Sequence, residues 1–382
     1  MSGIEVILKG QLSDEPPILT IPQATLLYEN APLNDLLFVA NEMREKRVPG
    51  RKVTYLIDRN INYTNICTIN CHFCSFYRPP GHDENYTQSI TQISDRISDL
   101  EKIGGSRILM QGGVNPDLEL NWYTNLITEL TVRHPTISLD CFSPIEIEGI
   151  AEVSGLTTRE VLREFKDAGM HGLPGGGAEM LVDSIRSGIS PLKGSAKNWL
   201  RVMEEAQEIG LTTSATNVFG FGETIENRVE HMSKIRDLQD SSISKGLPGF
   251  TSFISWPVML ENNTFGKMNK GANRVELGAG SVEYLRHVAV SRLFLHNINH
   301  IQASWPTMGL SVAQIALNGG ADDIGSTMME ENVVSASGTT KTDASINELR
   351  NSIIAAGYIP SERDSDYNAI GENTEGIQSV VR

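Results

Sequence analysis

Short runs of apolar or β-branched residues alternate with longer segments of helical period along most of the chain. This alternation is typical of βα units that join into a parallel sheet. The candidate strands are residues 53–58, 107–111, 137–142, 171–174, 212–219, 249–255, 299–304 and 321–326. The candidate helices are residues 87–104, 119–134, 157–169, 195–210, 224–240, 281–297, 308–318 and 343–356. Nearly every strand therefore has the crossover helix that a parallel connection requires.

Eight units of this kind predict an α/β fold, a TIM-type (β/α)8 barrel. A doubly wound open sheet also alternates, but the even spacing and the absence of a GxGxxG dinucleotide loop favour the barrel. Residues 22–47 carry apolar residues at helical spacing, interrupted near Pro32. We therefore expect a helical N-terminal extension over 1–50, a barrel over 51–370 and a flexible C-terminal tail over 371–382.

The charge of the chain restricts the class of partner. Lysine and arginine number 32 against 47 aspartates and glutamates, and the net charge is −15. Such a surplus of negative charge disfavours non-specific binding to nucleic acid or to an anionic membrane. Neither a secretory signal pattern nor a run of about 18 apolar residues is present. We expect a cytoplasmic protein that acts on a small molecule.

The four cysteines stand at positions 67, 71, 74 and 141, and the first three lie within eight residues as CxxxCxxC, just after the first predicted strand. Clustered thiols in a large intracellular protein bind metal or do redox chemistry more often than they form disulfides. On a helix, positions 67, 71 and 74 would share one face as small buried residues. The asparagines and threonines around them and the sequence Pro79-Pro80-Gly81 favour a loop instead.

Two kinds of metal site remain for this loop. A structural zinc site needs a fourth ligand, for which His72, His82 and Cys141 are the candidates, none at familiar zinc-ligand spacing. Three thiolates on one short loop suit a 4Fe-4S cluster better, because each binds one iron and the fourth iron keeps no protein ligand. Cys67, Cys71 and Cys74 are the predicted cluster ligands, and Cys141 is expected to be dispensable.

This motif, with the aromatic Phe73 before the last cysteine, resembles that of the radical S-adenosylmethionine (SAM) superfamily. The resemblance implies that the open iron binds the amino and carboxylate groups of SAM. An electron from the cluster then cleaves SAM to methionine and a 5'-deoxyadenosyl radical, which abstracts hydrogen from the substrate. It also implies a small electron donor such as a flavodoxin or ferredoxin.

The resemblance extends to the predicted SAM site. Gln111, Gly112 and Gly113 resemble the glycine-rich segment that receives the methionine amino group, although Val114 and Asn115 stand where an acidic residue is usual. Four acidic or hydroxyl residues at the carboxyl ends of later strands are assigned to SAM provisionally, although each also suits an ordinary helix start. They are Ser143, Glu146, Glu179 and Glu223.

Three further segments resemble the cyclic dehypoxanthine futalosine synthases of menaquinone biosynthesis by the futalosine pathway: PGGGAEM at 174–180, NHIQASWPTMG at 299–309 and GSTMMEENVVSASGT at 325–339. The resemblance runs from about residue 50 to about residue 370. It implies that the substrate is dehypoxanthine futalosine, a ribose-like sugar bearing a 3-substituted benzoate. Hydrogen abstraction at C4' and attack on the ring would give a spiro product. Aminofutalosine synthase is the alternative within the superfamily, and a structural zinc protein is the alternative outside it.

The same resemblance suggests where the substrate binds. His300, Glu330 and Glu331 are candidate proton acceptors because they lie at or beyond the last two strands. Four residues are candidates to line the pocket, with barrel core as the alternative role for the tryptophan: Gln302, Ser304, Trp305 and Thr307. Two arginines, Arg78 and Arg363, are candidates to pair with the benzoate carboxylate, although most arginines simply face solvent.

The long connection at residues 256–280 is either a lid or binding loop, or a disordered surface insertion. Its Trp256, Met259 and Phe265 favour packing, whereas its glycines and asparagines favour mobility.

Overall fold

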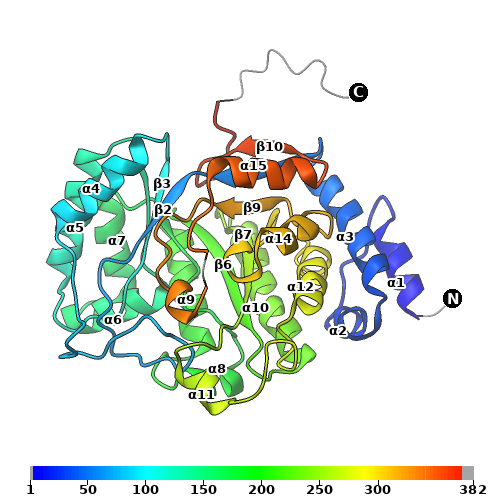
Figure 1. The fold of residues 1–382 in the computed structure, drawn as a ribbon, viewed down its shortest axis with the longest axis horizontal. Coiled ribbons are helices and arrows are strands. Elements are labelled where there is room, and N and C mark those ends of the chain that lie inside the picture. Colours follow the sequence, from blue (N-terminus) through cyan, green and yellow to red (C-terminus); the bar gives the residue numbers. More distant parts are fainter. Residues whose placement is uncertain (1–2, 340, 372–382) are drawn as a thin grey trace.

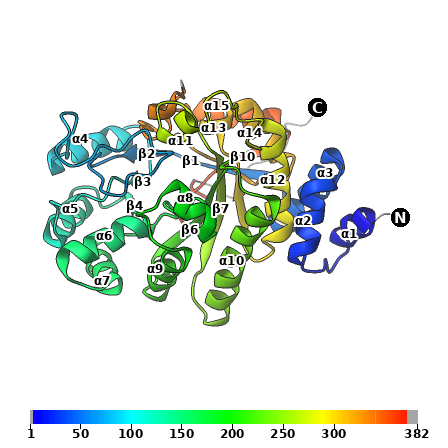
Figure 2. The same cartoon turned by 90° about the horizontal axis from the view of Figure 1, so that it is seen from below.

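A computed structural model describes residues 3–339 and 341–371, and its centre is a curled sheet surrounded by helices (Figure 1, Figure 2). The strands are β1 (Lys52–Leu56), β2 (Asp58–Ile61), β3 (Arg107–Met110), β4 (Ser138–Cys141), β5 (Gly172–Leu173), β6 (Thr212–Phe219), β7 (Phe250–Pro257), β8 (His300–Gln302), β9 (Asp323–Ser326) and β10 (Ile359–Glu362). Their order is β10-β1-β9-β8-β7-β6-β5-β4-β3-β2, and the paired strands are parallel.

The sheet closes through one extended segment. Only Ile57 separates β1 from β2, yet β1 pairs with β9 and β10 whereas β2 pairs with β3 at the far end of the strand order. Residues 52–61 therefore connect both ends of the sheet, which confirms the predicted barrel-type α/β fold. The predicted first strand is longer than 53–58 and changes partners in its middle, and β10 is a strand that the sequence pattern did not predict.

Helices near all eight predicted crossover positions surround the sheet: α4 (Ile90–Glu101), α5 (Leu120–Arg133), α7 (Thr158–Ala168), α9 (Ala196–Glu208), α10 (Ile225–Ser244), α12 (Ser281–Phe294), α14 (Leu310–Leu317) and α15 (Ile346–Ala355). Several begin at capping boxes, in which a Ser or Thr side chain and the residue three positions later satisfy each other's backbone groups, as at Ser89 and Thr157. A further helix, α1 (Gly3–Gln11), lies within the expected helical extension. The prediction missed four helices: α6 (Pro144–Ser154), α8 (Asp183–Ile189), α11 (Thr264–Met268) and α13 (Trp305–Met308).

The N-terminal helices pack on the outside of the barrel. The predicted break at Pro32 separates α2 (Ile21–Asn30) from α3 (Leu33–Arg47), and these helices contact α10 and α12. The Tyr28 hydroxyl lies 3.0 Å from Nδ1 of His287, a histidine that is fully buried. Beyond Gly371, the predicted C-terminal tail lies outside the described residues. Among the described helices, none is long and apolar enough to cross a membrane.

The interior of the barrel is hollow. TIM barrels usually fill this space with layers of bulky branched side chains. Here β6 turns the small residues Thr212, Ser214 and Thr216 inward, and β7 turns Ser252 inward. A cavity of about 300 Å³ results, lined by residues from the carboxyl ends of the strands down to their starts.

The chain after β10 closes the lower end of this cavity. We call residues 363–370 the C-terminal plug, because they cross the starts of the strands. Nε of Arg363 donates to Oδ2 of Asp323 at 2.5 Å, and the ring of Tyr367 stacks on His300 with centroids 3.9 Å apart. The hydroxyl of Ser365 adds a hydrogen bond of 2.8 Å to Oδ2 of Asp140 on β4.

The ion pair of the C-terminal plug gives a prediction about stability. The side chains of Arg363 and Asp323 are 2% and 0% exposed, so Arg363→Ala leaves a buried carboxylate uncompensated and should lower the free energy of unfolding by about 3–5 kcal/mol. Arg133→Ala breaks a surface pair whose partners are each 43% exposed, and should cost less than about 1 kcal/mol. Chemical denaturation of the metal-free protein measures both, and equal losses would contradict a structural role for the plug.

Candidate functional site

The three predicted cluster ligands lie on a loop that crosses the carboxyl ends of the strands. We call residues 62–82, which follow β2 directly, the cysteine loop. The backbone N–H of Cys67 donates to the carbonyl of Arg78 at 2.9 Å, which closes the loop on itself. The N–H of Thr68 donates to the carbonyl of Val114 at 3.1 Å, beyond the end of β3. The loop is therefore anchored to the barrel rim by main-chain bonds.

The long connection at 256–280 covers this loop. The N–H of Phe265, at the start of α11, donates to the carbonyl of His72 at 2.7 Å. Phe265 is buried against Phe221, whose ring in turn packs on that of Phe73. Trp256 and Met259, in the first part of the same connection, line the cavity. The structure thus shows a packed wall, which supports the packing interpretation over a disordered insertion.

The thiols of Cys67, Cys71 and Cys74 are free of disulfides, and Cys74 lines the cavity. Burial, reinforced by the charge of Cys71, raises the pKa of Cys74 to about 11, and burial also raises the pKa of Cys67. Thiolates here therefore need a bound cation. In the described part of the chain, no three potential ligands converge closely enough for a single metal ion, whereas a cluster needs only one thiolate on each of three irons. The donor set thus fits a 4Fe-4S cluster better than zinc.

The glycine-rich turn after β3 packs tightly against the cysteine loop. A Cβ on Gly113 would lie 2.1 Å from the carbonyl oxygen of Ile66 and 2.6 Å from Cβ of Cys67. Only glycine allows this approach. Next to it, Gln111 lines the cavity and donates from Nε2 to the carbonyl of Phe142 at 3.0 Å.

Glu146 and Ser143 support this turn from β4 and α6 rather than facing the cavity. Oε1 of Glu146 accepts from the N–H of Gly112 at 2.9 Å and from the hydroxyl of Tyr63 at 2.8 Å, while Ser143 donates to Oε2 at 2.7 Å. Burial raises the pKa of Glu146 to about 7, although these hydrogen bonds lower it. An acidic residue from α6 therefore stands at the corner where the sequence lacks one after the two glycines.

Glu179 lies on the cavity beside a buried lysine that the sequence analysis missed. Nζ of Lys193 lies 2.6 Å from Oε1 of Glu179 and 5.1 Å from the centroid of the Phe73 ring, while Oε2 of Glu179 has no hydrogen-bond partner among the described residues. Burial lowers the pKa of Lys193, whereas the negative charges of Cys71 and Glu179 raise it. The net shift of the Lys193 pKa is upward. No local pattern marks Lys193, because its partners are distant in sequence.

Glu223 has a different role from the one expected. Its carboxylate accepts from the N–H groups of Gly220 and Phe221 at 2.8 and 2.6 Å and pairs with Arg228 at 2.7 Å. It does not line the cavity. Glu223 therefore shapes the turn that carries Phe221, and its assignment to SAM is corrected.

Of the predicted substrate residues, the structure brings Gln302, Thr307, Glu331 and Arg363 to the cavity wall. Ser304 lies behind Thr307, to which its hydroxyl hydrogen bonds at 3.0 Å. Trp305 is buried and donates from Nε1 to the carbonyl of Ser326 at 3.0 Å. The core alternative therefore describes Trp305 better than substrate contact does.

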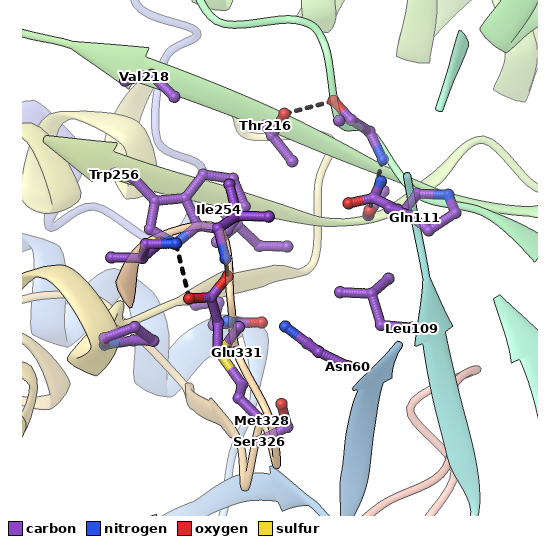
Figure 3. Close-up of a pocket in the computed structure, with 18 of the residues that line it drawn as sticks. Asn60, Leu109, Gln111, Thr216, Val218, Ile254, Trp256, Ser326, Met328 and Glu331 are labelled. Atoms are coloured by element: carbon purple, nitrogen blue, oxygen red, sulfur yellow. Dashed lines mark hydrogen bonds between the residues drawn. The ribbon is translucent and has the colours of Figure 1, made fainter. Parts of the chain in front are cut away.

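Glu331 remains the best-placed carboxylate among the proton-acceptor candidates. It is buried, lines the cavity, and accepts backbone N–H bonds from three residues of its own turn: Val333, Val334 and Ser335. Burial raises its pKa against these bonds. Figure 3 shows Leu109 and Gln111 across the cavity from Trp256, with Glu331 on the side of Trp256 and Asn60 nearer to Leu109.

Two of the three expected proton acceptors, His300 and Glu330, lie elsewhere. His300 starts β8 and so lies at the lower end of the barrel, where Asp322 binds its Nδ1 at 2.6 Å and Tyr367 covers its ring. Glu330, beside Glu331 in sequence, points outward to Arg59 and Arg96. These two assignments as proton acceptors are corrected.

The two arginines proposed to bind the benzoate carboxylate are both paired with carboxylates of the protein. Arg78 pairs with Glu84 at 2.6 Å and donates to carbonyls of the cysteine loop, away from the cavity. Arg363 reaches the cavity but is neutralised by Asp323. Neither is a free partner for an anion.

Comparison with known proteins agrees with this geometry. Residues 61–235 match the radical SAM superfamily and residues 247–375 match the CofH/MqnC C-terminal region. The chain is 42% identical, over 96% of its length and 95% of the relative's, to a cyclic dehypoxanthine futalosine synthase of Halalkalibacterium halodurans. The chain belongs to the radical SAM superfamily. Membership implies an enzyme that uses a 4Fe-4S cluster and SAM.

Two further relatives of this radical SAM chain show the breadth of the group. A cyclic dehypoxanthine futalosine synthase of Streptomyces coelicolor is 37% identical over 91% of this chain and 85% of its own. A 5-amino-6-(D-ribitylamino)uracil--L-tyrosine 4-hydroxyphenyl transferase of Archaeoglobus fulgidus is 36% identical over 87% of this chain and 92% of its own.

Solved structures support the fold of this radical SAM chain. Methylornithine synthase (PylB) matches with a TM-score of 0.71 at 16% identity, covering 93% of this chain and 97% of its own. The hydrogenase maturase HydG from Carboxydothermus hydrogenoformans matches with a TM-score of 0.74 at 16% identity, covering 95% of this chain and 80% of its own.

The cysteine loop gives a direct prediction. Replacing Cys67, Cys71 or Cys74 by Ala removes one of only three thiolates, so anaerobically prepared protein should lose its brown colour and its iron. Cys141→Ala removes a fully buried thiol on β4 and should keep the iron content of the unmodified protein. Iron and sulfide analysis with visible absorption measures the effect. Retention of a full cluster by any of the first three variants would contradict the ligand set.

The glycine turn gives a second prediction. Gly113→Ala places a methyl group within 2.1 Å of the carbonyl of Ile66, so the cysteine loop must move. We expect a folded protein with less than about half of the normal iron. Gly104→Ala is the matched control, because nothing lies within 4 Å of its added methyl group although its φ of +80° costs some stability. Equal iron in both variants would show that the close approach is unnecessary.

Proposed function

We propose that this chain converts dehypoxanthine futalosine to cyclic dehypoxanthine futalosine in menaquinone biosynthesis. The observation that carries the proposal is the 42% and 37% identity to two proteins named cyclic dehypoxanthine futalosine synthase, with nearly the whole chain covered in each case. The transferases of the same group are 33–36% identical. The cyclisation is therefore preferred over the transfer reaction.

The reaction needs a radical initiator and a protected cavity. Bound cluster and SAM would together supply the radical that removes hydrogen from C4' of the sugar. The carbon radical would then attack the benzoate ring. Loss of one proton to the acceptor and of one electron, for which the oxidised cluster would be the acceptor, would restore a closed-shell spiro product. The electron that reduces the cluster before SAM is cleaved comes from a small donor such as a flavodoxin or ferredoxin, which the superfamily implies.

The residues of this chain supply binding, orientation and a proton acceptor. In the proposal, Cys67, Cys71 and Cys74 hold the cluster, and Gln111 and the backbone of Gly112 and Gly113 receive SAM. Glu179 binds a hydroxyl or the ammonium group of SAM through Oε2, which has no hydrogen-bond partner among the described residues although Nη1 of Arg186 lies 3.7 Å away. Lys193 fixes the position of Glu179 through Oε1.

The substrate is proposed to lie below SAM. The apolar side chains Leu109, Ile254 and Trp256 suit contact with the aryl ring, and Gln302 and Thr307 are hydrogen-bonding partners. Glu331 is the proposed proton acceptor, because it lines the cavity and burial raises its pKa above that of an exposed glutamate. Water is kept out by the packed connection at 256–280 above and the C-terminal plug below.

An anaerobic product assay tests the proposal. Reconstituted protein with a reductant, SAM and dehypoxanthine futalosine should release 5'-deoxyadenosine together with a spiro product of the substrate, as detected by mass spectrometry. Glu331→Gln should lower turnover at least tenfold while 5'-deoxyadenosine is still formed, because hydrogen abstraction does not need the proton acceptor. Adducts containing adenosine would instead identify an aminofutalosine synthase, and transfer of a hydroxybenzyl group from tyrosine would identify the transferase activity. A colourless zinc protein without SAM cleavage would reject the enzyme altogether.

A further inference from the structure

The lower end of the cavity is polar, unlike its middle. Arg107 at the start of β3, Asp140 on β4, Thr212 at the start of β6 and Ser252 on β7 all line it. Leu109, two residues further along β3, begins the apolar part. We call the group of Arg107, Asp140, Thr212 and Ser252 the cavity floor. Nothing in the proposed SAM site or in the proposed proton transfer uses it.

Two atoms of the cavity floor are buried without a hydrogen-bond partner among the described residues. Oδ1 of Asp140 is unpartnered although the residue is only 6% exposed, and Nε of Arg107 is also unpartnered. The other oxygen of Asp140, Oδ2, accepts from Ser365 and lies 3.6 Å from Nη1 of Arg107. A buried polar atom left unpaired costs about 1–3 kcal/mol, so both atoms are poised to bind a ligand.

Gly172 keeps this carboxylate facing the cavity. It pairs with Asp140 across β4 and β5, and a Cβ at Gly172 would lie 2.5 Å from Oδ1 of Asp140. The absence of a side chain at this position therefore leaves the space that the carboxylate occupies. The free oxygen lies inside the barrel rather than between the sheet and its helices.

The charges around the cavity floor indicate what kind of ligand fits. Among the described residues that line the cavity, the only lysines or arginines are Arg107 and Arg363. Arg107 is paired with Asp58 at 2.5 Å and Arg363 with Asp323 at 2.5 Å. Together with Asp140, the carboxylates of Asp58 and Asp323 make three negative groups. They are matched by only two guanidinium groups, those of Arg107 and Arg363. An anion placed here would increase the surplus of negative charge in a buried site, whereas a neutral hydroxyl both donates to Asp140 and accepts from Arg107.

We propose that the cavity floor is a subsite for the sugar hydroxyls of the substrate, with one hydroxyl bound between Oδ1 of Asp140 and Nε of Arg107. The proposal rests on the proposed function, and it sets the orientation of the substrate: sugar downward, benzoate against the apolar wall and away from the floor. In this orientation the benzoate carboxylate does not bind Arg363, which is already paired with Asp323. Arg107 starts β3 and Gln111 directly follows its last residue, so the two are four residues or about 13 Å apart along the chain, which leaves a layer of about one sugar ring below SAM.

Equilibrium binding to the SAM-loaded enzyme without reductant tests this subsite separately from turnover. The ligands are dehypoxanthine futalosine and analogues that each lack one sugar hydroxyl. Asp140→Asn should weaken binding of the parent compound about tenfold or more, the loss expected for a hydrogen bond to a charged group. The analogue that lacks the hydroxyl bound by Asp140 should bind the unmodified enzyme more weakly than the parent compound by the same factor. Asp140→Asn should then weaken binding of that analogue no further.

Two more variants keep the result interpretable. Gly172→Ala retains every charge but displaces the carboxylate of Asp140, and should reproduce the selective loss even if Asp140→Asn folds poorly. Ser365→Ala removes the contact from the C-terminal plug to Oδ2 while leaving Oδ1 in place, and should change the dissociation constant less than about threefold. Melting temperatures verify folding.

Distinct outcomes overturn the subsite and the proposed function. If Asp140→Asn weakens the parent and every analogue by the same factor, or not at all, the subsite is wrong. A loss in Ser365→Ala equal to that in Asp140→Asn would show that the floor acts only through the plug, which also rejects it. If the unmodified enzyme forms no spiro product, the proposed function fails, whatever the binding data show.

Discussion

The site depends on one stretch of backbone, residues 52–61, which closes the barrel and then continues directly into the cysteine loop. Because this segment pairs with β9 and β10 in its first half and with β3 in its second, its end is fixed on the barrel rim. The carbonyl of Val114 and the packing surface of Gly113 hold the loop from the β3 side. The three thiols are therefore carried on a loop that begins at a fixed strand end and is held to the turn after β3 by a main-chain bond.

A second constraint is the hollow interior. Small inward residues on β6 and β7 leave a cavity where other barrels have core, and the chain compensates at both ends. Above the cavity, Phe265 of the 256–280 connection packs on Phe221, which packs on Phe73 of the cysteine loop, and the ion-paired C-terminal plug packs below. Buried charges are paired around the cavity, at Lys193 with Glu179 and at Arg363 with Asp323, so the few polar atoms left unpaired stand out as binding groups.

The sequence predicted what local patterns encode. The βα alternation gave the barrel, and the spacing of Cys67, Cys71 and Cys74 indicated the superfamily. It failed where a role depends on the direction of a side chain: Glu330 and Glu331 are neighbours, yet one faces outward and the other lines the cavity. His300 was misplaced because it stands at the start of its strand rather than at the end. Lys193 and the C-terminal plug were missed because their partners lie far away in sequence.

The central claim is a cluster held by three cysteines, with one iron left open to SAM above a cavity for a sugar substrate. Mössbauer spectroscopy of protein reconstituted with 57Fe, recorded with and without SAM, tests it most directly. The account predicts a 4Fe-4S spectrum in which SAM alters the signal of a single iron and leaves the other three unchanged. Four irons that do not respond to SAM, or a preparation without an iron-sulfur cluster, would contradict it.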